Sequence, residues 1–233
     1  MSQIKTAMVM AAGLGTRMRP LTNTMPKALV EVAGKPLIDY VIDPLVEAGV
    51  ARVIVNVHAF ADQMEAYLRR RSDVEILISD ERAKLLETGG GIKHARALLG
   101  EDPIFVCNSD YVWKAQSPMA ALLRTWDAAA MDACVVVIPK ERTLGFDTPG
   151  DFSQDAEHNL TRRGDAPTAP LHAFGIEILD PTLVYADPRE AFSLRDVWFA
   201  AAEKKRLRGL VLDGLWMQVG DPAAIAEAEA GLR

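Results

Sequence analysis

Cysteine is scarce in this sequence, and a long apolar run is missing from it. Cys107 and Cys134 are the only cysteines in 233 residues, and both lie in apolar, strand-like runs. Two cysteines cannot form a disulfide framework for a chain of this length, so we expect buried thiols. The first apolar run reaches a polar loop too soon for a signal peptide, and no later run is long enough to cross a bilayer. These absences predict a cytoplasmic protein.

Positive charge is also in deficit. The chain has 26 lysines and arginines against 32 aspartates and glutamates, which gives a net charge of −6 and a pI near 5.3. A surface of this sign repels nucleic acid and anionic membranes at long range, so we expect neither as a partner. Basic residues should therefore act where they cluster. Because 49% of the residues are hydrophobic, the chain is able to bury a large core, and we expect one domain over residues 1–233.

Apolar runs alternate with helical patterns along most of the chain. We expect strands at 52–57, 74–78, 104–110, 132–139 and 171–179, and helices at 36–48, 62–71, 92–99, 117–130 and 193–206. Such alternation predicts right-handed crossovers and an α/β fold with a mostly parallel sheet. Pro36 suits the first turn of a helix, and Gly49 suits its end. Glycines and prolines break the pattern between 140 and 169, where we expect one wall of a pocket.

The run from Met8 to Ala12 is apolar without alternation and stops at Gly13 and Gly15. Such a run suits a strand that is buried on both faces, and the two glycines let the backbone turn and approach a ligand. The dinucleotide fingerprint would need a third glycine where Met18 stands, and a P-loop would need Gly-Lys followed by Ser or Thr. Neither motif fits, so a third kind of phosphate-binding loop is predicted.

Basic residues follow this glycine pair. Arg17 and Arg19 come directly after it, and Lys27 lies a few residues on. Pro20 prevents a helix from running through the arginines, so we expect a long, extended loop. Such a loop is able to wrap a triphosphate. The alternative is a strand followed by a solvated basic loop.

Three consecutive glycines, Gly89 to Gly91, precede the helix expected at 92–99, and Glu87 and Thr88 come before them. Glycines at the start of a helix would leave N–H groups exposed and would let a planar ring lie on the backbone. A flexible entry loop to the helix is the alternative.

The strand expected at 104–110 ends in three polar residues, Asn108, Ser109 and Asp110. A carboxylate at the C-terminal end of a central strand lies where open α/β sheets bind ligands. Asp110 is therefore either a magnesium ligand beside a triphosphate or the cap of a following helix.

Together these runs resemble the signature of the sugar-1-phosphate nucleotidylyltransferases. That signature reads Gly-x-Gly-Thr-Arg-x-x-Pro-x-Thr followed by Pro-Lys, and residues 13–27 match it. The Glu-Thr-Gly-Gly-Gly segment and the short chain are most similar to the N-acetylmuramic acid 1-phosphate uridylyltransferases of that family. The resemblance implies a Rossmann-like three-layer fold with a mixed, mostly parallel central sheet. It also implies magnesium-dependent synthesis of a nucleotide sugar and pyrophosphate from a nucleoside triphosphate and a sugar 1-phosphate.

The resemblance also implies roles for individual residues. Arg17 would stabilise the leaving pyrophosphate, Lys27 the α-phosphate region, and Asp110 would hold the Mg²⁺. Residues 1–139 would bind the nucleotide, through Ala11, Ala12, Gly13, Gly15, Thr16, Arg17, Glu87, Thr88, Gly89 and Asn108.

Residues 140–233 would bind the sugar phosphate, through Asp151, Gly175 and Glu177. Gly150-Asp151-Phe152 is similar to a run in the muramate-type relatives, and Gly175 would let a sugar approach the backbone, although a plain strand explains it equally well. The family's Glu-Lys-Pro is missing, so its sugar-phosphate contact is not carried over. His172 is expected to be structural, because a preformed phosphate nucleophile needs little base.

Residues 216–222, Trp-Met-Gln-Val-Gly-Asp-Pro, resemble the family's Trp-x-Asp-Val-Gly-Thr-Pro, whose aspartate is the second magnesium ligand. This chain has Gln218 there, and an amide oxygen coordinates a cation without contributing charge. Asp221, at the family's threonine position, or Asp213 would be the compensating ligand. The alternative is a strand and turn without a metal.

We expect UTP and a sugar like N-acetylmuramic acid 1-phosphate as substrates, in cell-wall (peptidoglycan) sugar recycling. A guanylyltransferase that acts on mannose or heptose 1-phosphate is the nearest enzymatic alternative. A non-catalytic nucleotide-sugar-binding regulatory protein is the alternative from another class, and Gln218 is the feature that supports it.

Overall fold

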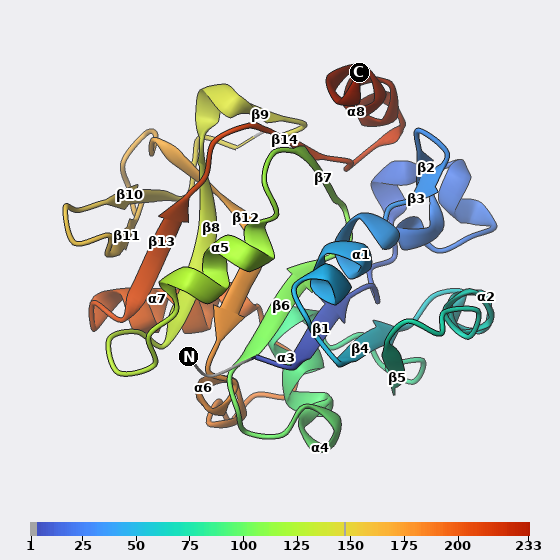
Figure 1. Ribbon diagram of the computed structural model, residues 1–233, viewed down its shortest axis with the longest axis horizontal. Coiled ribbons are helices and arrows are strands. Elements are labelled where there is room, and N and C mark those ends of the chain that lie inside the picture. The colour runs from blue at the N-terminus through green and yellow to red at the C-terminus, as the bar shows by residue number, and fades with distance from the viewer. Residues whose placement is uncertain (1–3, 147) are drawn as a thin grey trace.

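The computed structural model describes residues 4–146 and 148–233 of the chain (Figure 1), and within these ranges a nine-stranded sheet forms the centre of the molecule. Its strands are β1 (Thr6–Met10), β4 (Arg52–Val57), β5 (Glu75–Asp80), β6 (Ile104–Asn108), β8 (Ala133–Pro139), β10 (Phe152–Gln154), β11 (Leu160–Arg162), β12 (Leu171–Leu179) and β13 (Leu207–Val211). Their order is β11-β10-β12-β6-β1-β4-β5, and β8 pairs with β12 and β13 off this path.

The sheet is mixed, with a parallel part that contains the N-terminal strands. Strands β5, β4, β1 and β6 run parallel, and β12 runs antiparallel to β6 and β8. This confirms the predicted α/β fold with a mixed, mostly parallel central sheet. Met10 pairs with Asn108 at the ends of β1 and β6. The loops that follow these two strands therefore leave the sheet side by side, at the edge where parallel sheets bind ligands.

Helices cover both faces of the sheet. One face carries α1 (Asp39–Glu47), α2 (Ala61–Leu68) and α5 (Pro118–Thr125), and the other carries α3 (Glu87–His94), α4 (Arg96–Leu99), α6 (Thr182–Tyr185) and α7 (Leu194–Glu203). Successive residues of a strand point to opposite faces. In β1, Ala7 and Val9 accordingly pack with the first group of helices, whereas Met8 packs with the second. This explains why the run is apolar without alternation.

A smaller sheet lies beside the end of β6. It contains β7 (Tyr111–Lys114), β14 (Leu215–Gln218) and β9 (Thr143–Leu144), and α8 (Pro222–Leu232) packs against it. Strand β7 was not expected. Its antiparallel pairing with β14 sets Gln218 opposite Tyr111. The C-terminal part of the chain therefore reaches the residue that follows Asp110.

The expected helix at 36–48 begins later than predicted. Pro36 belongs to β3 (Lys35–Pro36), which forms a hairpin with β2 (Glu31–Val32), and the helix begins at Asp39. The N–H of Leu37 donates to the carbonyl of Val30, so the backbone there is still paired with the preceding segment. Gly49, with φ of +85°, follows the helix as expected.

The basic loop was predicted to be extended, but the structure corrects this. Three short 3₁₀ turns interrupt it: η1 (Thr16–Met18), η2 (Leu21–Asn23) and η3 (Lys27–Leu29). Another, η4 (Lys140–Arg142), lies in the segment that lacked periodicity. Pro20 lies between the first two turns, so its ring does not interrupt a helix. Within the described ranges, no helix is long and apolar enough to cross a membrane.

The three consecutive glycines lie inside a helix, which corrects the prediction that they precede one. Helix α3 begins at Glu87, and Gly89, Gly90 and Gly91 are buried in it. A Cβ on Gly90 would lie 2.3 Å from the carbonyl oxygen of Glu190. These glycines therefore allow the segment before α7 to pack directly on the helix backbone.

Candidate active site

A cavity of about 370 Å³ opens where β1, β4 and β6 end. We call it the glycine-loop cavity. It is lined by most of the residues that the sequence assigned to a nucleotide, Gly89 being the exception. Its lining consists of Met10, Ala11, Ala12, Gly13, Gly15, Thr16, Arg17, Lys27, Ala28, Asn56, Glu81, Leu85, Glu87, Thr88, Asn108, Ser109, Asp110 and Gly220.

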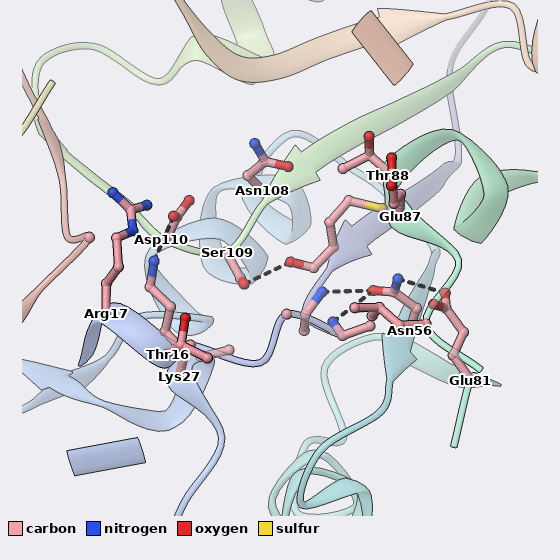
Figure 2. A pocket seen from close by; sticks show the side chains of 18 residues that line it. Thr16, Arg17, Lys27, Asn56, Glu81, Glu87, Thr88, Asn108, Ser109 and Asp110 are labelled. Carbon is pink, nitrogen blue, oxygen red and sulfur yellow. Dashed lines mark hydrogen bonds and ion pairs between the residues drawn. The ribbon is translucent and has the colours of Figure 1, made fainter. Parts of the chain in front are cut away.

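Asn56 holds the start of the glycine loop in place. Its Oδ1 accepts hydrogen bonds from the backbone N–H groups of Ala11 at 2.7 Å and Ala12 at 3.3 Å. Its Nδ2 donates to Oε1 of Glu81 at 2.8 Å, which fixes the orientation of the amide (Figure 2). Both N–H groups are therefore occupied in this structure, so a ligand would contact these two residues through their other atoms.

Asn56 and Glu81 were not among the site residues predicted from the sequence. Asn56 is a polar residue in the otherwise apolar run of β4, and Glu81 comes directly after β5. Glu81 is buried, and desolvation raises the pKa of its carboxyl, whereas the hydrogen bonds from Asn56 and from the N–H of Leu86 oppose that rise. A Cβ on Gly91 would lie 2.7 Å from Oε1 of Glu81, so helix α3 also depends on glycine at this contact.

Charged groups gather at one end of the glycine-loop cavity (Figure 2). Nζ of Lys27 lies 2.7 Å from Oδ2 of Asp110, and the two side chains are 16% and 19% exposed. The Arg17 guanidinium lies against Gly220, where an added Cβ would be 3.4 Å from Nη1. Asn56, Glu81, Glu87 and Thr88 lie at the other end. The structure thus brings together Arg17, Lys27 and Asp110, as the sequence predicted.

Hydrogen bonds join the loops around this charged end. The Ser109 hydroxyl donates to the carbonyl of Met10 at 2.8 Å, which links the ends of β6 and β1. The Thr22 hydroxyl donates to the carbonyl of Gly15 at 2.7 Å. Gly15 has φ of +60°, and a Cβ there would lie 2.9 Å from Cβ of Lys27. Glycine is therefore required at this turn, close to the base of the lysine.

A second cavity, of about 250 Å³, adjoins the first one and shares Thr88 and Asn108 with it. We call it the Glu177 cavity. Asp151, Gly175 and Glu177, the residues assigned to the sugar phosphate, all line it. The other residues of its lining are Val106, Tyr111, Phe146, Thr148, Ala173, Ser193, Leu194, Arg195, Trp198 and Gln218.

Gly175 brings the backbone of β12 close to Asn108, which lies on the border of both cavities. Its φ is +61°, and a Cβ there would lie 2.3 Å from Nδ2 of Asn108. The pairing of β12 with β8 shifts register between Ala173 and Glu177. A side chain at position 175 would therefore displace Asn108 from the junction of the two cavities.

Glu177 has no partner for its carboxyl group among the described residues. The residue is 1% exposed, and neither carboxyl oxygen makes a hydrogen bond there. Nε1 of Trp198 also lacks a partner that meets hydrogen-bond geometry in the described part of the chain. Burial raises the pKa of Glu177 well above its ordinary value, and the nearby indole N–H of Trp198 opposes that rise although its geometry is poor for a hydrogen bond. Unpaired groups of this kind at the wall of a cavity are suited to a polar ligand.

Gln218 is the one residue of the predicted second metal position that reaches a cavity. Its Nε2 lies 3.5 Å from Oδ2 of Asp110, and its amide lines the Glu177 cavity. Asp221 instead caps helix α8, by accepting hydrogen bonds from the N–H groups of Ala223 and Ala224. Asp213 forms an ion pair with Arg142.

Neither Asp221 nor Asp213 lines either cavity. The described residues also contain no group of three acidic, histidine or cysteine side chains that could hold a metal. His172 is buried between Thr143 and the carbonyl of Thr148 and is stacked on Phe146, which fits the structural role expected for it.

The arrangement of the two cavities is suited to one class of enzyme. Two adjoining cavities at the carboxyl edge of an α/β sheet, one with a glycine loop and a Lys–Asp pair, suit the transfer of part of a nucleotide to a second substrate. The chain belongs to the nucleotidyl transferase family, whose model matches residues 6–147.

Individual relatives agree with this assignment. The chain is 49% identical to the N-acetylmuramate alpha-1-phosphate uridylyltransferase of Caulobacter vibrioides, over 98% of this chain and 97% of that protein. It is 30% identical to the mannose-1-phosphate guanylyltransferase catalytic subunit beta of Drosophila pseudoobscura pseudoobscura, over 93% of this chain but only 59% of that subunit.

Solved structures support the fold. A putative glucose-1-phosphate thymidylyltransferase from Bacillus anthracis superposes with a TM-score of 0.83 at 16% identity, over 99% of this chain and 95% of that one. At this identity the likeness bears on the fold alone.

Proposed function

We propose that this protein transfers UMP from UTP to N-acetylmuramate α-1-phosphate and releases pyrophosphate. The observation that carries the proposal is the junction of the two cavities at Asn108, beside the Lys27–Asp110 pair. A nucleotide in the first cavity and a sugar phosphate in the second would meet there. The name of the Caulobacter relative supports the choice of UTP and of this sugar.

The glycine-loop cavity would hold the nucleotide, as residues 1–139 were predicted to do. Arg17 and Lys27 supply positive charge at the end where the phosphates would lie. We assign Arg17 to the leaving pyrophosphate and Lys27 to the α-phosphate. Glu87 and Thr88, at the opposite end, are assigned to the base and ribose. Gly89 is assigned a supporting role, because its N–H already donates to the carbonyl of Phe192.

The donors near Asp110 suit Mg²⁺. A carboxylate oxygen of Asp110 and the amide oxygen of Gln218, after rotation of that amide, are hard ligands, and the substrate phosphates would complete the coordination. When bound, Mg²⁺ would neutralise charge on the phosphates that react. In this structure Lys27 forms an ion pair with the Asp110 carboxylate. It would turn towards the α-phosphate once the cation is present.

The reaction needs little acid–base chemistry. An oxygen of the sugar phosphate attacks the α-phosphorus of UTP, and the bond from that phosphorus to the oxygen that bridges to the β-phosphate breaks in line with it. The nucleophile is already an anion, so no side chain has to remove a proton. Catalysis therefore depends on positioning at Asn108 and on the positive charge of Arg17 and Lys27.

Residues 140–233 would supply most of the sugar-binding wall. Gly175 keeps Asn108 at the junction, and Glu177 offers two unpaired oxygens to the sugar. Because burial raises the pKa of Glu177, the protonated carboxyl is able to donate one hydrogen bond and accept another.

An assay of pyrophosphate release tests the proposal. UTP and GTP are each combined with the 1-phosphates of N-acetylmuramic acid, N-acetylglucosamine, mannose and a heptose, in Mg²⁺. We expect the highest kcat/KM with UTP and N-acetylmuramic acid 1-phosphate. Turnover with GTP alone would contradict the proposal and would favour the guanylyltransferase alternative, which the Drosophila relative supports. Binding of a nucleotide sugar without any turnover would favour a regulatory protein.

A further inference from the structure

The Glu177 cavity has an uneven distribution of charge. Among the described residues that line it, Arg195 is the only cation, whereas Asp151 and Glu177 are both acids. Arg17 and Lys27 line only the glycine-loop cavity. An anionic group in the Glu177 cavity therefore has one obvious partner among the lining residues that the structure describes.

The guanidinium of Arg195 is oriented by Asp151, but most of its N–H donors have no partner in the described chain. It lies in the first turn of α7, and its Nη2 donates to Oδ1 of Asp151 at 3.0 Å. The other carboxyl oxygen, Oδ2, accepts a hydrogen bond from the N–H of Ala173 at 3.0 Å. The guanidinium carbon also lies 5.7 Å from the ring centroid of Phe199. Asp151 is thus an anchored group that orients the arginine.

Most of the donors of Arg195 remain available. A guanidinium has five N–H donors, and within the described chain the Arg195 guanidinium makes its hydrogen bond only with Asp151. Its side chain is 55% exposed, whereas that of Asp151 is 14% exposed. The fork of an arginine matches the two oxygens of a carboxylate, and such a pair is strong and directional.

The buried side of the same cavity is suited to uncharged polar groups of a ligand. Glu177 is 1% exposed, and in the described part of the chain neither its carboxyl oxygens nor the nearby indole N–H of Trp198 make a hydrogen bond of good geometry. An acetamido group or sugar hydroxyls would supply the missing hydrogen bonds. A ligand that fits the whole cavity therefore carries neutral polar groups on one side and an anion on the other.

We infer that Arg195, oriented by Asp151, binds the carboxylate of the lactyl ether of N-acetylmuramate 1-phosphate and so selects this sugar over N-acetylglucosamine 1-phosphate. The inference rests on the proposed function. The two sugar phosphates differ only by the lactyl ether, so a carboxylate contact is the natural means of telling them apart. The phosphate itself has to reach the α-phosphorus in the other cavity, whose lining does not include Arg195.

Arg195→Gln tests the inference. With N-acetylmuramate 1-phosphate, kcat/KM should fall about 10- to 100-fold, because a charge-assisted, two-pronged contact is lost. With N-acetylglucosamine 1-phosphate it should change less than about threefold. Arg195→Lys should retain part of the selectivity, since a lysine keeps the charge without the fork. Calorimetric binding of both sugar phosphates to each variant gives the same comparison without requiring turnover.

Arg162→Gln is the matched control. The Arg162 guanidinium carbon lies 5.3 Å from the same Phe199 ring, but this residue does not line the cavity. Its substitution should leave both substrates unaffected. Equal losses for the two sugar phosphates in Arg195→Gln, or no loss for either, would overturn the inference. If the wild-type protein does not turn over N-acetylmuramate 1-phosphate, the proposed function fails first.

Discussion

The glycine-loop cavity and the Glu177 cavity differ in how far their most buried carboxyl groups are hydrogen-bonded. In the first, Asn56, Glu81, Lys27 and Asp110 all have partners within the protein. In the second, the carboxyl of Glu177 has none among the described residues. Polar groups that are already paired hold a ligand-binding surface in shape, whereas unpaired ones favour a ligand that completes them.

The two cavities also differ in the strands that build them. The glycine-loop cavity uses loops that leave the parallel strands β1, β4, β5 and β6 at one edge. The Glu177 cavity uses the antiparallel strand β12, the start of helix α7 and the end of β14. The shape of the glycine-loop cavity is therefore set by the sheet itself, whereas that of the Glu177 cavity is set by how later elements pack on the sheet.

Asp110→Asn, in the glycine-loop cavity, should have the largest effect. It removes the charge that holds Lys27 at 2.7 Å and that would bind Mg²⁺. We expect kcat to fall on the order of a thousandfold, which is typical when a charged group that acts on the reacting phosphates is lost. Steady-state pyrophosphate release measures it. Asp213→Asn is the control, since that side chain is 93% exposed and should be nearly neutral. Less than a tenfold loss in Asp110→Asn would contradict its assignment.

Asn56→Ala should weaken nucleotide binding without affecting the sugar phosphate. It leaves the N–H groups of Ala11 and Ala12, and Oε1 of Glu81, without their partner. We expect KM for UTP to rise about 10- to 100-fold, the range produced by losing a buried hydrogen-bonded group. KM for the sugar phosphate should change little.

Asn159→Ala provides a matched buried asparagine. Asn159 bonds to Asp155 and lines neither cavity. Its substitution should lower the melting temperature but leave both KM values unchanged. If Asn56→Ala instead raises both KM values equally, the two cavities are not independent.

The charged end of the glycine-loop cavity was largely predictable from sequence because most of its residues are close together in the chain. Gly13, Gly15, Arg17 and Lys27 lie within fifteen residues, and Asp110 ends a strand where α/β sheets bind ligands. Local patterns were therefore sufficient to place these residues together.

The missed residues depend on contacts between distant segments. Asn56 stands 45 residues from Ala11, and Arg195 stands 44 residues from Asp151. Neither pair has a local signal, since a helix pattern reveals its apolar face and not the partner of an exposed arginine. Gly89 to Gly91 were predicted to precede a helix but lie inside α3, because packing against Phe192 and Glu190 outweighs the low helix propensity of glycine.

Gln218→Asp tests whether the proposed Mg²⁺ site beside Asp110 is weakened by the absence of a second carboxylate. The Nε2 of Gln218 lies 3.5 Å from Oδ2 of Asp110. A second carboxylate there should lower the Mg²⁺ concentration for half-maximal activity by roughly three- to tenfold. A Mg²⁺ titration of pyrophosphate release measures it, with Gln154→Asp, remote from both cavities, as the control. Nucleotide binding without turnover in both the wild-type protein and the variant would support the regulatory alternative.

Glu177→Gln should have a small effect on the stability of the protein, and its pH dependence contrasts the two cavities directly. Burial raises the pKa of Glu177 above its ordinary value of 4.5. The folded state therefore binds more protons than the unfolded state above that pH, so the free energy of unfolding falls as pH rises. The variant lacks this penalty. It should melt about 2–4 °C higher than wild type at pH 8, the shift that ~1 kcal/mol produces in a domain of 150–250 residues, and the difference should vanish near pH 4.5.

Glu81→Gln sharpens this contrast between the cavities. Burial raises the pKa of Glu81 as well, but its hydrogen bonds from Asn56 and Leu86 oppose the rise, and glutamine would have to accept both with one oxygen. Its gain in melting temperature at pH 8 should therefore be smaller than that of Glu177→Gln, or negative. The melting temperatures of both variants and of the wild type, measured from pH 4 to 8, test this difference. Equal, pH-dependent gains in the two variants would mean that the carboxyl in the glycine-loop cavity is no better satisfied than the one in the Glu177 cavity.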